Sequence, residues 1–68
     1  MHRTPVQSST IVSVGYDPER ETLEIEFKSG VYHYTGVPSH VYDDLIAAPS
    51  AGGFLAEFVK GRYPFAKA

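Results

Sequence analysis

The segment TLEIEFKSGVYHYT, residues 22–35, carries the strongest structural signal in this chain of 68 residues. Its first half alternates apolar residues (positions 23, 25 and 27) with polar ones (22, 24 and 26), which is the pattern of a strand with one buried face. Ser29 and Gly30 suit a hairpin turn, and residues 31–35 are rich in the aromatic and β-branched types that favour strands. The segment therefore predicts a β-hairpin.

The turn also predicts how the two strands of the hairpin pair. If Ser29 and Gly30 form a two-residue loop, Ile25 lies opposite Tyr34, and residues directly opposite one another share a face. Tyr32 lies on the same apolar face, because it is two residues from Tyr34. We therefore expect both tyrosines to pack in the core with their hydroxyl groups at its rim, and stacking of nucleic-acid bases on their rings is the alternative.

His33 falls on the opposite, polar face in this register, across from Glu26. We expect a surface pair rather than a metal site, because a metal normally needs at least three protein ligands. His40 lies beyond the end of the strand, and the chain has no cysteine. The sequence therefore predicts neither a metal nor a cofactor.

Residues 10–16, TIVSVGY, precede the hairpin and predict a third strand. Val12, Val14 and Tyr16 share one parity and hence one face, and Asp17-Pro18 opens the turn that leads into the hairpin. The three strands form an antiparallel meander.

Two short helices are predicted after the sheet. Apolar residues recur at helical spacing in two groups, which are Val41, Tyr42, Leu45 and Ile46, then Phe54, Leu55, Phe58 and Val59. Pro38 suits the first turn of the first helix, Ser50 suits the N-cap of the second, and Gly61 suits its C-cap. The fold class is therefore α+β: a three-stranded meander with two helices packed on its apolar face, in the order β-β-β-α-α. The polar face should lie in water.

The length allows one domain, which we place at residues 9–68 after a flexible lead-in at residues 1–8. No segment is apolar enough to cross a bilayer and no signal peptide opens the chain, so we expect a cytoplasmic protein without a membrane partner. Ser8 and Ser9 are expected to cap a turn rather than to act as nucleophiles, because no catalytic motif surrounds them. So short a chain also has little room for a ligand pocket, and we expect no enzyme.

Charge is unevenly distributed along a chain whose net charge is −2. Five carboxylates and one cation lie between residues 17 and 26, whereas the segment from residue 58 to the end has three cations and no carboxylate. Aromatic residues lie between these cations, and the combination suits contact with phosphates and bases. The candidate nucleic-acid-binding residues are Lys60, Arg62, Tyr63 and Lys67. The alternative is that Tyr63 and Phe65 pack against the edge of the sheet and that the cations are only solvated.

An ordered series of short motifs from residue 8 to residue 65 resembles the KTSC domain family. The matching residues are Ser8-Ser9, Val14 to Pro18, Leu23 to Gly30, Tyr32-His33-Tyr34, Gly36-Val37-Pro38, Val41-Tyr42, Ser50, Gly52 and Gly61 to Phe65. The chain departs from the family pattern at Thr10, Gly53, Leu55 and Ala56, and so loses a polar and a basic side chain in the second helix.

The KTSC domain occurs at the C-terminus of certain lysyl-tRNA synthetases and as a small stand-alone bacterial protein. The resemblance implies a non-enzymatic domain of uncharacterised role, and the synthetase context suggests a weak nucleic-acid-binding module with tRNA or another structured RNA as its partner. The acidic net charge favours the alternative, a protein-interaction module or small homodimer that pairs through a sheet edge or an exposed aromatic residue. Salt-dependent RNA binding separates the two hypotheses.

Overall fold

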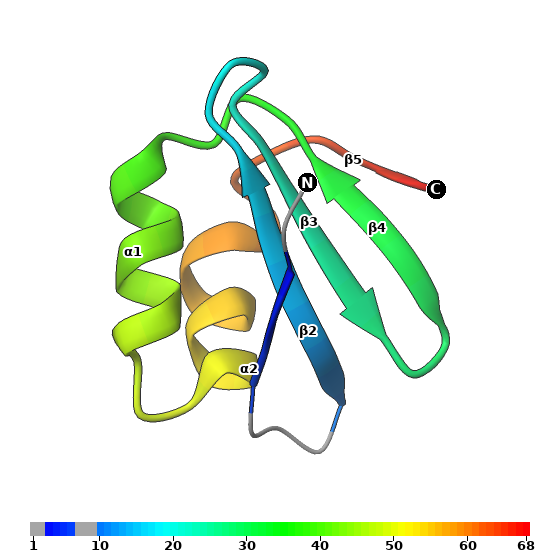
Figure 1. Cartoon of the computed structure of the whole chain (residues 1–68), viewed down its shortest axis with the longest axis vertical. Helices are drawn as coiled ribbons and strands as arrows, with labels where there is room; N and C mark the ends of the chain where they lie inside the picture. The colour runs from blue at the N-terminus through cyan, green and yellow to red at the C-terminus, as the bar shows by residue number, and fades with distance from the viewer. Residues whose placement is uncertain (1–2, 7–9) are drawn as a thin grey trace.

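The computed structural model describes residues 3–6 and 10–68. The elements follow one another as β1 (Arg3–Pro5), β2 (Ile11–Asp17), β3 (Thr22–Phe27), β4 (Gly30–Tyr34), α1 (Ser39–Ala47), α2 (Ala51–Phe54), the π-helical segment η1 (Leu55–Val59) and β5 (Phe65–Lys67). The strands form one antiparallel sheet in the order β1-β2-β3-β4-β5 (Figure 1). The α+β class and the two-helix layer are confirmed.

The predicted number of strands is wrong, because the sheet has five strands rather than three. β1 lies within residues 1–8, for which no regular structure was predicted. β5 lies in the C-terminal segment after Gly61, for which no strand was predicted. Each has only three residues, so neither contains enough positions to display an alternating pattern. The predicted domain boundary between residues 8 and 9 lies outside the described residues, as do Ser8 and Ser9.

The hairpin register differs from the predicted one by two residues. Tyr34 pairs with Leu23 rather than with Ile25, and Ile25 pairs with Tyr32. Phe27 pairs with Gly30 rather than with Tyr32, so the loop is formed by the two residues before Gly30. Because side chains alternate with a period of two, this shift leaves every side chain on its predicted face. Tyr34 is 3% exposed, which confirms its place in the core, and Tyr32 is half-buried against that core.

A β-bulge in β2 overturns one prediction about its faces. Ile11 pairs with Phe27 and Ser13 pairs with Glu26, so the intervening Val12 is an extra residue. A bulge reverses the parity of the residues before it. Ile11 is accordingly 1% exposed and belongs to the core, whereas Val12, which was predicted to share a face with the buried Val14, is 42% exposed.

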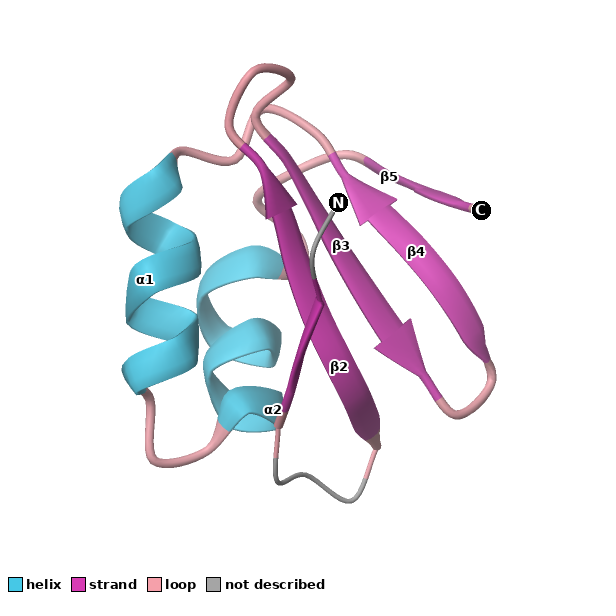
Figure 2. Cartoon of the chain, in the orientation of Figure 1, coloured by secondary structure: helices cyan, strands magenta, loops and turns pink. Residues whose placement is uncertain are grey.

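The two helical segments cover only part of the apolar face. Among the described residues, eleven form the buried core: Ile11, Val14, Leu23, Ile25, Tyr34, Val37, Val41, Leu45, Ala51, Leu55 and Val59. The helices lie on the β2 side of the sheet, and neither lies beside β4 or β5 in Figure 2. The outer part of the apolar face, toward β5, therefore lies beyond the helices, and Phe65 there is 62% exposed.

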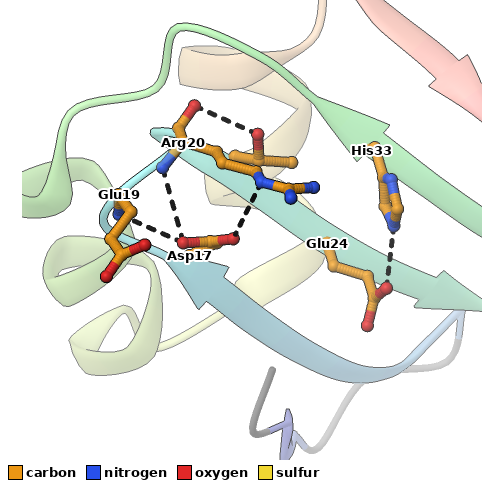
Figure 3. Close-up of polar contacts among 6 residues, drawn as sticks. Asp17, Glu19, Arg20, Glu24 and His33 are labelled. Carbon is orange, nitrogen blue, oxygen red and sulfur yellow. Dashed lines mark hydrogen bonds and ion pairs between the residues drawn. The ribbon is translucent and has the colours of Figure 1, made fainter.

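The opposite face of the sheet is acidic and largely self-paired. His33 Nε2 lies 2.8 Å from Glu24 Oε1, so its partner is Glu24 and not the predicted Glu26 (Figure 3). Ser13 Oγ donates a hydrogen bond to Glu26 Oε1 at 2.8 Å. Ser13 is buried and both glutamates are half-buried, so the prediction that this face lies in water is wrong for these residues.

The turn between β2 and β3 is closed by a side chain. Asp17 Oδ1 accepts hydrogen bonds from the backbone N–H groups of Glu19 and Arg20, at 3.1 and 3.4 Å (Figure 3). Asp17 Oδ2 lies 3.9 Å from Arg20 Nε. The Asp17 carboxylate is thus fixed at one end of the sheet.

Ser50 is the N-cap of α2, as predicted. Its hydroxyl oxygen accepts a hydrogen bond from the Gly53 N–H at 3.1 Å. Ser50→Ala is expected to lower the free energy of unfolding by about 1 kcal/mol, because it removes this cap. Urea unfolding measures the change. Ser39→Ala is the matched control, since Ser39 is exposed and α1 has no side-chain cap. Equal effects of the two substitutions would contradict the capping role.

Candidate functional site

The outer part of the apolar face forms a groove of about 390 Å³. Its lining residues come from the β3–β4 hairpin and the C-terminal tail, and they are Phe27, Ser29, Tyr32, Tyr34, Lys60, Gly61 and Phe65. A second hollow of about 360 Å³ shares Phe27, Ser29 and Lys60 with it. We call the first hollow the aromatic groove. Its volume reaches the lower end of the roughly 300–1,000 Å³ typical of ligand sites, so the prediction of little room for a pocket is wrong.

Four aromatic rings form a continuous row along the groove. Phe27 and Tyr32 meet edge to face with centroids 5.5 Å apart, and Tyr32 and Phe65 are tilted by 58° at 5.9 Å. Phe65 also lies 5.5 Å from Tyr34, with a tilt of 38°. β5 creates this row, because it pairs Phe65 with Tyr34 and thereby places both rings on one face.

The four rings differ in how much a ligand can reach. Phe65 is 62% exposed, Tyr32 is half-buried, and Tyr34 lies in the core at the base of the groove. Burial raises the pKa of the Tyr34 hydroxyl above its usual value of 10.0, and the neighbouring Tyr32 adds to this effect. Tyr34 is therefore a neutral, structural ring, whereas Phe65 and Tyr32 offer the accessible aromatic surface.

Lys60 borders the groove at the end of the helical layer. Its backbone N–H donates to the Leu55 carbonyl at 2.9 Å, and its Nζ lies 5.3 Å from the centre of the Phe27 ring. Gly61, which follows it, has a φ of 81°, a conformation that favours glycine. The chain thus turns sharply after Lys60 while the ammonium group stays over an aromatic face.

Lys67 borders the groove from β5. It pairs with Tyr32, and residues opposite one another share a face. A Cβ atom added at Gly30 would lie 2.9 Å from Lys67 Cε, so the side chain of this lysine extends across Gly30. The glycine leaves the space in which the lysine stem lies beside the aromatic rings.

Of the four predicted binding residues, Lys60 lines the groove, and Lys67 lies outside the lining but beside it, opposite Tyr32. Arg62 is exposed but is not part of the groove lining. Tyr63 is half-buried and packs against the core, as the alternative prediction had it, while Phe65 lies on the edge strand and remains exposed. Sequence reasoning placed Phe27 in the core and missed it as a groove residue. The sequence carried one signal for this role: Phe27 is the third aromatic residue, with Tyr32 and Tyr34, on one face of a short hairpin.

Neither the helices nor the acidic side chains of the described residues point to another kind of site. No three His, Asp or Glu side chains among residues 3–6 and 10–68 are close enough to hold a metal ion. Within the same part of the chain, no helix is long and apolar enough to span a membrane. The aromatic groove is therefore the candidate functional site.

Comparisons with known proteins agree with this architecture. A crystal structure of a KTSC domain protein from Yersinia pestis superimposes with a TM-score of 0.95, at 41% identity over 98% of this chain and 96% of that one. A protein of Tsukamurella paurometabola is 47% identical over 60 residues, which are 87% of this chain and 90% of the relative. An uncharacterised protein of Stutzerimonas stutzeri is 42% identical over 64 residues, covering 93% and 90% of the two chains.

A similar sequence also occurs within a much larger enzyme. The lysine–tRNA ligase of Nostoc punctiforme is 43% identical over 60 residues, which are 87% of this chain but only 11% of the ligase. The sequence pattern of the KTSC domain matches residues 7–63, most of the 68-residue chain. The chain therefore belongs to the KTSC domain family.

Proposed function

We propose that this KTSC domain binds RNA at the aromatic groove. The supporting observation is the row of four rings, bordered by Lys60 and Lys67, at the part of the sheet face that the helices do not cover. Aromatic faces stack on bases, and ammonium groups neutralise phosphates. Two bordering cations also make the groove unfavourable for a cationic ligand, which separates it from the aromatic cages that bind quaternary ammonium groups.

The relationship with lysine–tRNA ligases supports RNA as the nucleic acid. These relatives are named for an activity on tRNA, and the matching segment is a small part of each of them. A binding module is the role that we infer for so small a segment of such an enzyme. We extend that role to this chain, with tRNA or another structured RNA as the partner.

The charge distribution predicts how RNA lies on the domain. Glu24 and Glu26 occupy the face opposite the groove, and Asp17 and Glu19 lie in the turn between β2 and β3. These carboxylates repel phosphates. The RNA therefore contacts the β4–β5 side of the sheet and avoids the β2–β3 turn.

The remaining two predicted residues take different roles in this proposal. Arg62 is exposed between the groove and Tyr63, and it supplies a third cation for the RNA backbone. Tyr63 packs against the core and positions the tail rather than stacking on a base. The three cations Lys60, Arg62 and Lys67 limit the salt dependence that the tail can produce.

Titration of a labelled, unstructured RNA oligonucleotide at several salt concentrations tests the proposal. We expect the logarithm of the binding constant to fall with the logarithm of salt concentration, with a slope no steeper than about −2, because each phosphate neutralised on a single strand contributes roughly −0.7. Replacing Lys60 and Lys67 with alanine should flatten the slope by about 1.4 without lowering the melting temperature.

Arg20→Ala is the matched control for the substitutions of Lys60 and Lys67. Arg20 is also an exposed cation, but it lies in the acidic turn beside Asp17. Its removal should leave the salt slope unchanged. If the wild type does not bind RNA at low salt, the proposal is wrong. Light scattering at the same concentrations then tests the alternative, in which two copies or another protein pair with the β5 edge.

A further inference from the structure

The aromatic groove is lined mainly by aromatic side chains, which are Phe27, Tyr32, Tyr34 and Phe65. Phe65 is 62% exposed and leans on both Tyr32 and Tyr34, while Tyr34 forms the base of the groove. An aromatic ring binds a flat group most favourably when the two stack face to face. In an RNA duplex the faces of the bases are covered by their neighbours, whereas an unpaired base has at least one open face.

The charge of the domain is too small to replace stacking. A protein that binds the phosphate backbone of a duplex releases counterions from many phosphates, and such a protein usually has a basic excess. This chain has a net charge of −2, and Lys60 and Lys67 are the cations that border the groove among the described residues. Binding energy beyond two or three phosphate contacts must therefore come from the rings.

The size and lining of the groove favour a few bases with little regard to their identity. Its volume of about 390 Å³ suits one or two planar groups rather than the surface of a helix. Ser29 and the tyrosine hydroxyl groups are the few neutral polar side-chain groups in its lining. Proteins distinguish bases by hydrogen bonds to the base edges. Because the groove has so few donors and acceptors, it distinguishes little between base sequences.

We infer that the aromatic groove selects unpaired bases, so that the RNA bound by this domain is single-stranded at the point of contact, with one or two bases on Phe65 and Tyr32. This inference rests on the proposed RNA binding and names its substrate class. Lys60 and Lys67 contact the phosphates that flank these bases. A loop, bulge or free end of a folded RNA meets the requirement, and a continuous helix does not.

The test compares one RNA sequence in two states. An unstructured oligonucleotide of ten residues and the blunt duplex that it forms with its complement are titrated separately with the full-length protein. We expect the single strand to bind at least about tenfold more tightly than the duplex, because only its bases can stack. The chain has no tryptophan, and two of its five tyrosines, Tyr32 and Tyr34, line the groove, so quenching of tyrosine fluorescence by the single strand reports binding.

Phe65→Ala separates stacking from backbone contact. Loss of one stacked base corresponds to a weakening of roughly 5- to 150-fold for the single strand, and the duplex affinity should change less than about twofold. Phe65→Trp should restore tight binding. Phe58→Ala is the matched control, because Phe58 is also a half-exposed ring but packs on Phe54, outside the groove. Its removal should leave both affinities unchanged.

Four results would overturn the inference. Duplex binding that is as tight as single-strand binding would contradict selection for unpaired bases while leaving RNA binding itself intact. An equal loss for both ligands in Phe65→Ala, or an equal loss in Phe58→Ala, would contradict stacking in the groove. Absence of binding to both ligands at low salt would remove the proposed function and this inference together.

Discussion

Tyr34→Ala is expected to unfold most of the protein at room temperature. Tyr34 is 3% exposed, pairs with Leu23 across the central hairpin and supports Phe65 at the edge of the sheet. Truncation of a buried aromatic residue costs about 3–5 kcal/mol. A stability of about 0.05–0.15 kcal/mol per residue gives roughly 3–10 kcal/mol for a chain of this length, so the loss is a large part of the total. Circular dichroism with urea unfolding measures it.

Tyr34→Phe is the control, because it keeps the ring and removes only the hydroxyl group. It should remain folded at neutral pH. Burial raises the pKa of Tyr34 above 10.0, its value when unfolded. A raised pKa stabilises the fold below pH 10 and this contribution is lost as the pH rises toward the higher folded value. Tyr34→Phe should therefore lose less stability above pH 10 than the wild type does. Wild-type melting of Tyr34→Ala would place Tyr34 in a binding role instead.

Leu55→Ala is expected to destabilise the protein more than Phe58→Ala, although phenylalanine is the larger residue. Leu55 is 1% exposed and belongs, with Ala51 and Val59, to the stripe of the second helical segment that enters the core. Truncating a buried leucine costs about 2–5 kcal/mol. Phe58 is 44% exposed, and its ring packs on that of Phe54 at a centroid distance of 4.8 Å. Its loss should cost about 1 kcal/mol.

Urea unfolding of the two variants under identical conditions measures this difference. A larger loss for Phe58→Ala would show that Phe58 enters the core, and that the stripe through residues 51, 55 and 59 is wrong. Glu57→Ala, at an exposed position of the same segment, controls for helix propensity and should change the stability by less than about 0.5 kcal/mol.

The sequence by itself determined the features that depend on neighbouring residues. Alternation over residues 22–27 located β3 and its buried face, because side-chain direction in a strand has a period of two. Ser50 marked the start of α2, because a cap needs only a hydroxyl group three residues before a free N–H group. The same periodicity assigned Tyr34 to the core, even though the predicted register was displaced by two residues.

Only the tertiary structure decided the features that depend on distant residues. β5 exists because it pairs with β4, about thirty positions earlier in the chain, and three residues carry no local pattern that announces such a pairing. The bulge at Val12 follows from its fit against β3, and parity alone placed this residue on the wrong face. The aromatic groove is of the same kind. Periodicity showed which residues are apolar on one face, but the helices determined which of them are covered, since burial depends on where the covering layer ends. The aromatic groove lies where the covering layer ends, and its lining includes Phe27, Tyr32, Phe65 and Lys60.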